Sequence, residues 1–345
     1  WVVEVTTYRS EAYDPASRKP VVDFGDTLAG DLARRDFTVN AMAVRIPGRV
    51  VEDPYGGVVD LAHQELRTPG RPEDSFSDDP LRMMRAVRFA SQLNFDIEAD
   101  TFEALTSQAE RLKIISAERI IDELNKIIMS PLPSYGFTLL FHSGLLKQFF
   151  PEMVALHGVE YVGNQAHKDN FFHTLQVLDN VSKVSDDLWL RWAAIMHDIA
   201  KPATKKFHKE QGWTFHGHEE KGARMTPSIF RRLKLPMDER MMFVQKLVRL
   251  HLRPIPLVRQ VSDSAIRRLL FEAGNDIDAL MKLCRADITS KNNEKVTRFL
   301  KNFDLVERKM AEVEEKDARV RIYGKKASAE ELAGLDVADD VVDAL

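Results

Sequence analysis

The chain has 345 residues, enough for about two domains or for one domain with helical extensions, and it can bury a substantial core. Its 44% hydrophobic and 30% charged residues are typical of a soluble globular protein, and no apolar run indicates a membrane span or a secretory signal. The single cysteine, Cys284, excludes an internal disulfide framework and fits a reducing cytoplasm. A net charge of −4 argues against general coating of nucleic acid, so any such contact should come from local basic faces.

The first residues predict a strand and then a loop. Residues 1–8 are rich in β-branched and aromatic types, and their alternation places Glu4 on the face opposite Val3 and Val5. Because the sequence opens inside this pattern, we expect further residues before Trp1. The following segments predict, in order, a loop over 10–30, a strand over 44–51, a turn over 53–57 and a small α/β region closed by 58–66.

The segment Asp31–Met42 combines two adjacent arginines, a carboxylate and an amide. Helix-like spacing of the apolar residues from Phe37 onward predicts a helix start around the polar residues Arg34, Arg35, Asp36 and Asn40. The guanidinium groups could bind phosphate oxygens, and the carboxylate and amide could hydrogen-bond a sugar hydroxyl. The alternative is a solvated arginine and aspartate cap without a ligand.

Helical patterns dominate beyond Asp79. Pro80 suits the first turn of a helix capped by Ser77 or Asp78. Further elements are predicted in chain order: a helix start at 116–119, a hairpin over 204–216, a long charged helix over 291–317 and a frayed end over 329–345. The chain is therefore expected to be mostly helical, with a small α/β part at its start.

The helix predicted after Pro80 carries arginines at three-residue intervals, Arg82, Arg85 and Arg88, with Asp79 at its N-terminal end. A solvated basic face is the simpler interpretation of such a stripe. However, adenine and cytosine each present an amino donor beside a ring-nitrogen acceptor, whereas guanine and uracil present a carbonyl beside an N–H. Asp79 as acceptor and Arg82 as donor would therefore admit A and C, because an unpaired buried polar group costs about 1–3 kcal/mol.

Seven of the ten histidines lie between His167 and His251. His197 and Asp198 follow the apolar run 188–196, where a buried carboxylate beside an imidazole is costly without a cation or strong partners. Further nitrogen and oxygen ligands lie on other helical segments: His173, His218, His251 and Asp287. Such a set suits Mn, Fe, Co, Ni or Mg better than a thiolate zinc site.

Four motifs occur in an order that resembles the class II tRNA nucleotidyltransferases (CCA-adding enzymes) and the related bacterial poly(A) polymerases: residues 32–42, 53–57, 78–89 and 118–124. The resemblance covers roughly the first 150 residues. The sequence of residues 1–9 and the helical second half most resemble the actinobacterial branch that contains an HD domain.

This resemblance implies that Asp79 and Arg82 form a protein template that reads the incoming base. Asp78 stands where the family usually has glutamate, which affects only a supporting role. Glu4 matches the position of a third active-site carboxylate. Family members also carry a Gly-Gly turn and an Asp-x-Asp pair for two metal ions further upstream, and neither precedes Glu4 here. We therefore expect this chain to bind nucleotide weakly without polymerising, and the natural protein to be longer at its N-terminus.

The resemblance also implies ligands for the rest of a nucleotide. The triphosphate would be bound by Arg34 or Arg35 together with Arg85 and Arg88. The ribose would be bound by Asp36 and Asn40. Mg²⁺ is the implied ion of this head.

The histidine spacing resembles the HD phosphohydrolase superfamily. The resemblance implies four defining metal ligands, His173, His197, Asp198 and Asp287, and two ligands of a second metal, His218 and His251. It implies a phosphatase or 2',3'-cyclic phosphodiesterase that could trim or repair RNA ends. The alternative is an inherited helical domain whose metal is structural or lost. The remaining histidines of this region are expected at the surface or beside the ligands: His167, His208 and His216.

Together these inferences predict an α+β, mostly α, protein. Its parts would be a truncated nucleotidyltransferase α/β head (1–70), a helical neck with the template and RNA-binding surface (71–150), an HD-type all-α body (151–290) and a helical tail (291–345). The expected function is addition of C and A to tRNA 3' ends from CTP and ATP in the cytoplasm, with Mg²⁺ in the head and a transition metal or Mg²⁺ in the body. The alternatives are a poly(A) polymerase or partial (CC- or A-) adding enzyme, and an HD phosphohydrolase with an RNA-binding remnant head.

Overall fold

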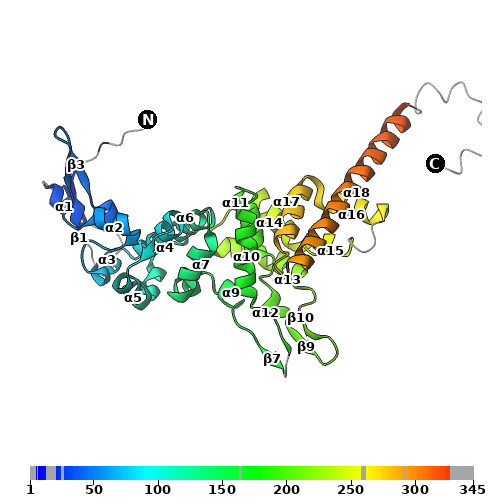
Figure 1. Ribbon diagram of the computed structural model, residues 1–345, viewed down its shortest axis with the longest axis horizontal. Coiled ribbons are helices and arrows are strands. Elements are labelled where there is room, and N and C mark those ends of the chain that lie inside the picture. Colours follow the sequence, from blue (N-terminus) through cyan, green and yellow to red (C-terminus); the bar gives the residue numbers. More distant parts are fainter. Residues whose placement is uncertain are drawn as a thin grey trace, which may run out of the picture. The chain divides into compact units, whose positions relative to one another are not determined.

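The computed structural model describes residues 5, 7–12, 21–24, 27–162, 165–257, 262–290 and 292–326. It divides into two compact units, Trp1–Arg249 and Leu250–Leu345. Helices dominate both units, and each strand of the described ranges belongs to a two-stranded ladder (Figure 1). The mostly helical α+β prediction is therefore confirmed. Glu4 and most of the strand expected over 1–8 lie outside the described residues.

The first part of the larger unit consists of short elements: β1 (Arg9–Ala12), β2 (Val21–Phe24), α1 (Leu28–Ala33), η1 (Thr38–Asn40), β3 (Ala43–Arg45), β4 (Val50–Glu52), α2 (Gly57–His63) and β5 (Glu65–Leu66). β1 and β2 pair antiparallel with Arg9 opposite Phe24, so the loop predicted over 10–30 is wrong. The apolar, β-branched run at the start of β2 favours a strand despite the turn formers around it.

The helix start predicted around Arg34 is also wrong. The side chain of Thr27 caps α1 by accepting a hydrogen bond from the backbone N of Gly30 at 3.3 Å, so this helix starts earlier and Arg34 is its C-cap. Phe37 is extended, with φ −134°, and η1 supplies only one 3₁₀ turn. Phe37 and Ala41 are fully buried. Their spacing therefore reflects tertiary packing and not a helical face.

The strand predicted over 44–51 is in fact two strands, because β3 and β4 pair with Val44 opposite Val51. Pro47 lacks an N–H and Gly48 has φ +116°, which together interrupt a continuous strand. The turn predicted over 53–57 is confirmed. There the Asp53 carboxylate accepts hydrogen bonds from the backbone N of Gly57 and of Val58, at 2.7 and 3.0 Å, and so caps α2.

The neck consists of α3 (Pro72–Asp78), α4 (Leu81–Leu93), β6 (Asp96–Ile97), α5 (Ala99–Ser107), η2 (Ala109–Ile114), α6 (Ala117–Ile128) and α7 (Pro133–His142). α4 packs against both α6 and α7. At their junction a Cβ on Gly136 would lie 2.5 Å from Cγ2 of Ile127, so only glycine allows this close approach. The helix start predicted at 116–119 is confirmed, with Ser116 as the N-cap of α6.

The cap of α4 differs from the prediction. Ser77 and Asp78 belong to α3, a short helix that begins with Pro72 and that the sequence analysis did not predict. Asp79 lies between the two helices, and its Oδ1 accepts a hydrogen bond from the backbone N of Leu81 at 3.1 Å. The residue expected to read a base therefore also caps the helix that carries the arginines.

The body follows with α8 (Leu145–Phe149), α9 (Pro151–Val154), β7 (Tyr161–Val162), β8 (Gln165–Ala166), α10 (Asn170–Ser182), α11 (Leu188–Met196), α12 (Lys201–Thr204), β9 (Lys206–His208), β10 (Gly212–Thr214), α13 (His218–Arg232) and α14 (Glu239–Leu250). The hairpin predicted over 204–216 is confirmed as β9 and β10, with Trp213 opposite Phe207. Trp192 of α11 is fully buried and donates a hydrogen bond to Asn125 Oδ1 at 2.9 Å, which joins the body to α6 of the neck.

Arg191 strengthens the same joint. Its guanidinium is buried and donates hydrogen bonds to backbone oxygens at the end of α6 (Ile128 and Ser130) and near the end of α10 (Ser182 and Ser185), at 2.9–3.3 Å. Burial lowers the pKa of this guanidinium. One side chain therefore satisfies carbonyl groups of helix ends from both the neck and the body.

The smaller unit contains α15 (Pro254–Leu257), α16 (Asp263–Ala273), η3 (Gly274–Asp276), α17 (Ile277–Ala286) and α18 (Asn293–Lys326). The long charged helix predicted over 291–317 is confirmed and extends further. It contacts α15, α16 and α17 through one buried stripe: Phe303, Val306, Met310 and Val313. None of the helices in the described ranges combines the length and hydropathy that crossing a bilayer requires.

Candidate functional site

A cationic cleft of about 560 Å³ lies in the larger unit where the loop after α1 meets α4 and α6. Five arginines, two aspartates, Asn40, Leu81 and Phe89 line it. The arginines are Arg34, Arg35, Arg82, Arg85 and Arg119, and the aspartates are Asp36 and Asp79. A cleft of this size with this excess of positive charge can hold an anion such as a nucleoside triphosphate.

Asp36 is the centre of one wall. Its side chain is buried, and Oδ2 accepts a hydrogen bond from Nε of Arg85 at 2.8 Å. Oδ1 accepts hydrogen bonds from the backbone N of Phe37 at 2.9 Å and from Nδ2 of Asn40 at 3.1 Å. The residues predicted to bind ribose therefore lie side by side, and one arginine predicted to bind phosphate, Arg85, contacts Asp36 directly.

Asp31 holds the two adjacent arginines. Its buried carboxylate accepts hydrogen bonds from Nε and Nη2 of Arg34 at 3.1 and 2.6 Å and from Nη2 of Arg35 at 2.9 Å. Each arginine contacts a different carboxylate oxygen. No role was predicted for Asp31, although its spacing of three and four residues from the arginines could have indicated one.

We expect Asp31→Asn to weaken CTP binding to this chain by about 3–10-fold, because it removes charge-assisted hydrogen bonds worth about 1.5–3 kcal/mol each that orient both arginines. Isothermal titration with CTP measures the effect. Asp74→Asn is the matched control. Asp74 is exposed, and its carboxylate makes only a long contact with Arg71, 4.0 Å between Oδ2 and Nε. Tighter binding by Asp31→Asn would show that the charge of Asp31 matters more than its orienting contacts, contrary to this prediction.

Asp79 and Arg82, the two residues of the base-template prediction, line the same cleft. Arg82 is buried, and it donates hydrogen bonds from Nη1 to Ser75 Oγ at 2.9 Å and from Nη2 to the backbone oxygen of Arg34 at 2.6 Å. Oδ2 of Asp79 lies 4.0 Å from Nη2 of Arg119. Arg82 retains further N–H groups, because a guanidinium carries five.

Arg88 does not line the cleft. Its guanidinium donates hydrogen bonds to the buried Glu123 and, at 3.0 Å, to Oε1 of Gln92, and it lies 3.9 Å above the ring of Phe89. In contrast, Phe89 and Arg119 do line the cleft, and the sequence analysis missed both. Arg119 comes from a separate helix, so no local pattern placed it near Asp79, although it lies within one of the quoted motifs.

A second cluster surrounds Asp198 in the body. His197 Nε2 and His218 Nε2 each lie 3.2 Å from this carboxylate, and His173 Nε2 lies 3.5 Å from it. The carboxylate and both nearer rings are buried. The structure therefore brings four of the predicted metal ligands together within one unit.

The backbone fixes the orientation of two of these rings. Nδ1 of His197 lies 2.7 Å from the carbonyl oxygen of Ala194, and Nδ1 of His218 lies 2.8 Å from that of Phe215. Because a carbonyl only accepts, Nδ1 donates in both rings, and Nε2 is the atom directed at Asp198. A metal-binding imidazole commonly donates its other nitrogen in this way, so the donor set fits a divalent cation with oxygen and nitrogen ligands.

Lys201, which the sequence analysis did not select, contacts the same carboxylate. Its Nζ lies 2.6 Å from Oδ2 of Asp198, three residues earlier in the chain. Burial alone would raise the pKa of the Asp198 carboxyl, but the adjacent His197 and Lys201 hold that pKa well below its usual range. Asp198 is therefore a carboxylate anion in a site rich in nitrogen donors.

The two remaining predicted ligands, His251 and Asp287, lie in the smaller unit, where His251 is buried. Cys284 Sγ lies 3.0 Å from the backbone oxygen of His251, and burial raises the pKa of its thiol well above its usual value. The only cysteine of the sequence therefore remains protonated, in agreement with a site without thiolate.

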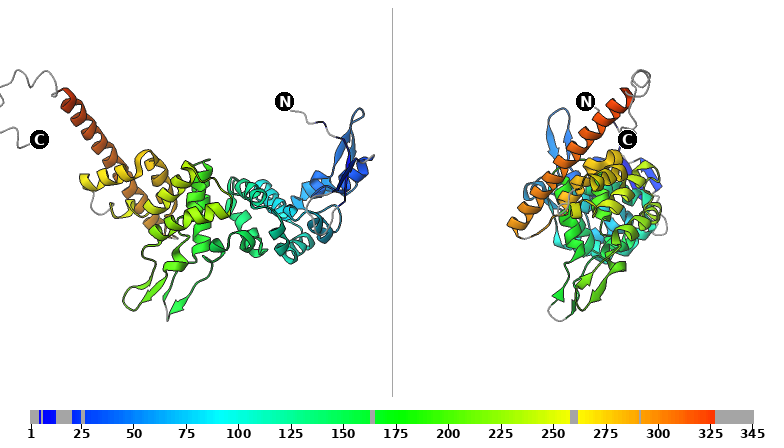
Figure 2. Two further views of the ribbon diagram at one scale, coloured as in Figure 1. Left: turned by 180° about the vertical axis from the view of Figure 1, so that it is seen from behind. Right: turned by 90° about the vertical axis from the view of Figure 1, so that its right-hand side faces the viewer.

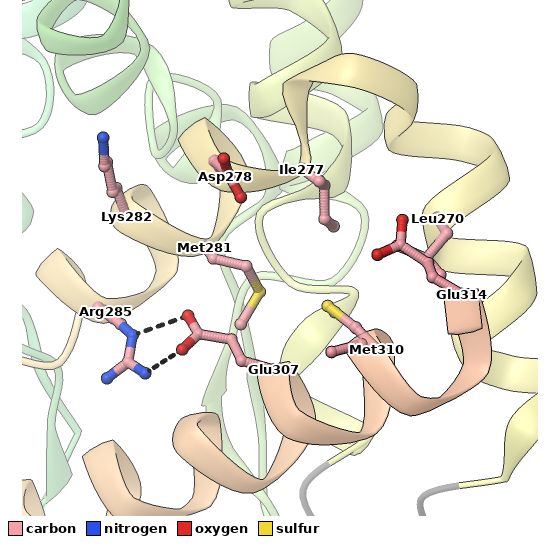
Figure 3. Close-up of a pocket in the computed structure, with 10 residues that line it drawn as sticks. Leu270, Ile277, Asp278, Met281, Lys282, Arg285, Glu307, Met310 and Glu314 are labelled. Carbon is pink, nitrogen blue, oxygen red and sulfur yellow. Dashed lines mark hydrogen bonds and ion pairs between the residues drawn. The ribbon is translucent and has the colours of Figure 1, made fainter. Parts of the chain in front are cut away.

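The smaller unit also contains a cleft of about 450 Å³ between α16, α17 and α18. Met281 and Met310 approach each other across it, and Arg285 makes a paired contact with Glu307 (Figure 3). This ion pair and a second one with Asp304 raise the pKa of Arg285. The charges of this cleft are thus largely matched internally, unlike those of the arginine-rich cleft.

Three family models match the chain in succession. Residues 2–67 match the poly A polymerase head domain, residues 94–156 match the probable RNA and SrmB-binding site of polymerase A, and residues 170–292 match the HD domain. The HD match contains all six predicted metal ligands of the body, whereas the cleft is matched at its residues from 34–40 and at Arg119 but not at those from 79–89.

Curated proteins and solved structures agree with these models. An A-adding tRNA nucleotidyltransferase of Deinococcus radiodurans is 37% identical over 268 residues, which are 75% of this chain and 60% of that protein. A CCA-adding enzyme of Levilactobacillus brevis is 47% identical over 150 residues, 43% of this chain and 37% of that protein. The crystal structure of the Bacillus stearothermophilus CCA-adding enzyme with CTP superposes with a TM-score of 0.56 and 25% identity, covering 87% of this chain and 63% of that one.

This chain thus spans about three fifths or less of the length of these curated relatives. Its three matched segments follow one another without overlap, from the head through the RNA-binding segment to the HD domain. The chain therefore belongs to the class II tRNA nucleotidyltransferase family, in a form that carries an HD domain.

Proposed function

We propose that the protein is a tRNA nucleotidyltransferase that adds C and A to tRNA 3' ends from CTP and ATP without a nucleic-acid template. The observation that supports this most is the convergence of the predicted base-reading pair, the predicted ribose-binding pair and several arginines on one cleft. The named relatives and the family models give the same reaction class. The cleft supplies what such a reaction needs from the protein, which is orientation of the nucleotide and compensation of its charge.

The roles within the cleft follow from the contacts. Arg34 and Arg35, oriented by Asp31, would bind the triphosphate, while Asp36 and Asn40 would bind the ribose. Arg85 now pairs with Asp36 and would exchange part of that contact for phosphate oxygens. Phe89 offers an aromatic wall beside them. Arg88, which pairs with Glu123, would support this wall and not bind phosphate itself.

Base selection would use groups that the fold has oriented in advance. Oδ1 of Asp79 caps α4, which fixes the carboxylate and turns Oδ2 toward the cleft side chain Arg119. Oδ2 would accept a hydrogen bond from the amino group of C or A. Arg82, fixed by Ser75 and Arg34, would donate a remaining N–H to the neighbouring ring nitrogen. A base with a carbonyl and an N–H at these positions would leave two polar groups unpaired.

We further propose the domain limits 1–70, 71–150, 151–290 and 291–345 for head, neck, body and tail. Mg²⁺ would serve the head, with Glu4 as one carboxylate of the catalytic centre. Glu4 lies outside the described residues, so this role stays a prediction. The tRNA 3' end would be the macromolecular partner, and the cytoplasm the place of action.

A second activity is favoured by the Asp198 cluster. We propose that the body is a metal-dependent phosphohydrolase acting on phosphate esters at RNA ends. His173, His197, Asp198 and Asp287 would hold one divalent ion, and His218 and His251 would be ligands of a second. Such ions would supply Lewis acidity toward the ester and toward a bound water. Mn, Fe, Co, Ni and Mg are the ions that these ligands suit. Lys201 would neutralise phosphate charge beside Asp198.

The test is incubation of the full-length protein with tRNA that ends before CCA and with each labelled nucleoside triphosphate. Ordered incorporation of C, C and A is expected. Incorporation of A alone, or of long A runs, would overturn CCA addition in favour of an A-adding enzyme or a poly(A) polymerase. Absence of incorporation together with phosphate release would leave only the phosphohydrolase.

A further inference from the structure

We propose that two neighbouring hairpins of the body form a surface that binds single-stranded RNA and delivers its 3' end to the Asp198 cluster. We call this surface the twin hairpin and define it by residues 158–162, 165–168 and 204–216, which include β7 to β10. In Figures 1 and 2 both hairpins project together from the helical body. The inference rests on the proposed function in taking RNA as the ligand.

The two hairpins form one structure because His167 joins them. Its ring packs edge-on against those of Trp213 and Phe215, with ring centres 5.2 and 5.7 Å apart. Nε2 accepts a hydrogen bond from the backbone N of Glu160 at 3.2 Å. Lys205 adds an ion pair with Glu160 and lies 5.7 Å from the ring centre of Trp213. These aromatic contacts join the two hairpins and involve none of the exposed lysine side chains.

The outer side chains of this projection are basic. The twin hairpin contains four lysines and two glutamates, a net charge of +2 in a chain of net charge −4. Lys168, Lys206 and Lys209 are exposed. Such a concentration of positive charge on a projecting element attracts the phosphates of a nucleic acid even when the whole protein is acidic.

An exposed aromatic ring accompanies the lysines. Tyr161 in β7 is 72% exposed, although a tyrosine ring gains stability when it is removed from water. Surfaces that bind single strands combine lysines for the backbone with rings on which bases stack, each stacked base contributing about 1–3 kcal/mol. An acidic protein partner would use the lysines but would have no comparable use for the ring, so RNA fits the surface better.

The surface continues to the metal-binding cluster. Lys201 lies 5.6 Å from the ring centre of Phe215 and 2.6 Å from Oδ2 of Asp198. Phe215 also supplies the carbonyl that orients His218. A strand bound along the twin hairpin would therefore bring its terminal phosphate past Lys201 toward the cluster, where a phosphohydrolase requires it.

The binding test compares Lys206→Glu/Lys209→Glu with the matched control Lys147→Glu/Lys183→Glu, in which two exposed lysines outside the twin hairpin undergo the same charge change. We expect the first double variant to bind a fluorescent single-stranded RNA about 10-fold more weakly at physiological salt, with a shallower salt dependence. The control should bind like the parent. Equal losses in the two variants would overturn the proposal, and so would equal competition by polyglutamate and RNA.

Cross-linking provides a readout that does not depend on activity. RNA with a photoreactive 4-thiouridine at its 3' end should cross-link to peptides that contain residues of the twin hairpin, and Tyr161→Ala should reduce the yield. Cross-links confined to 30–125 would overturn the proposal. Nucleotide addition by the full-length protein should be unchanged in the twin-hairpin variants, and hydrolysis of a small chromogenic phosphate ester should be unchanged too. If the parent protein added no nucleotide at all, this would contradict the proposed function and not the twin-hairpin proposal, which the cross-links test separately.

Discussion

Asp198→Asn is expected to remove divalent-metal binding by the body, with affinity falling at least about 100-fold. Changes to residues that merely support metal ligands already cost about 10–100-fold, and Asp198 is the carboxylate on which three histidines and Lys201 converge. Asparagine has nearly the same shape and retains an oxygen acceptor, but it lacks the negative charge that compensates a cation. Metal content by mass spectrometry and calorimetric titration with Mn²⁺ measure the loss.

The control for this variant is His216→Ala. His216 is exposed and lies two residues before His218, and the sequence analysis did not count it among the ligands. It should bind the metal like the parent. Circular dichroism should show that Asp198→Asn remains folded. Equal metal content in Asp198→Asn and in the parent would refute the cluster as a metal site.

Asp79→Asn is expected to lower the discrimination between CTP and UTP by about 10–100-fold, because one of two matched hydrogen bonds, worth about 1–3 kcal/mol when left unpaired, is removed. The affinity for the triphosphate part of either nucleotide should change much less. Asparagine is preferred to alanine, since its side-chain oxygen can still cap α4 through Leu81. Competition between CTP and UTP, in binding to this chain and in incorporation by the full-length protein, measures the effect.

Asp78→Asn is the matched control for the template. Asp78 ends α3, next to Asp79 in sequence, but it does not line the cleft. It should leave base selection as in the parent. Unchanged selection in Asp79→Asn would remove Asp79 from the template, and an equal loss in both variants would indicate a general distortion of the junction between the two helices.

Much of the arginine-rich cleft could be predicted because its motifs are local. Arg82 and Arg85 lie on one helix, and that spacing was readable from the sequence. Arg119 was not predicted, since it reaches the cleft from α6 through tertiary packing. Arg88 continues the three-residue spacing of Arg82 and Arg85 but donates its hydrogen bond to Glu123. This buried carboxylate lies 35 positions away in sequence, so the periodicity of the helix gives no sign of the contact.

The errors in the head share a physical cause. β1 to β4 have only three or four residues each, so alternation has too few positions to show, and Phe37 and Ala41 imitated a helix because both are buried by their neighbours. In the body, the buried His197 and Asp198 were predictable from the apolar run before them. Lys201 was not, because a lysine one turn beyond a buried carboxylate is ordinary at the surface.

The position of Arg191 restricts how such proteins can be recombined. Its guanidinium binds main-chain oxygens at the ends of α6 and α10, and every residue type carries such oxygens. Substitutions at those acceptor positions would therefore preserve the joint, whereas no other side chain offers five N–H groups in one plane. In a chimera with its crossover near residue 150, Arg191 would come from one protein and the end of α6 that it binds from another, so the acceptor oxygens could be misplaced. Exchange of bodies between relatives should instead carry α6 and α11 together, as a single inherited block.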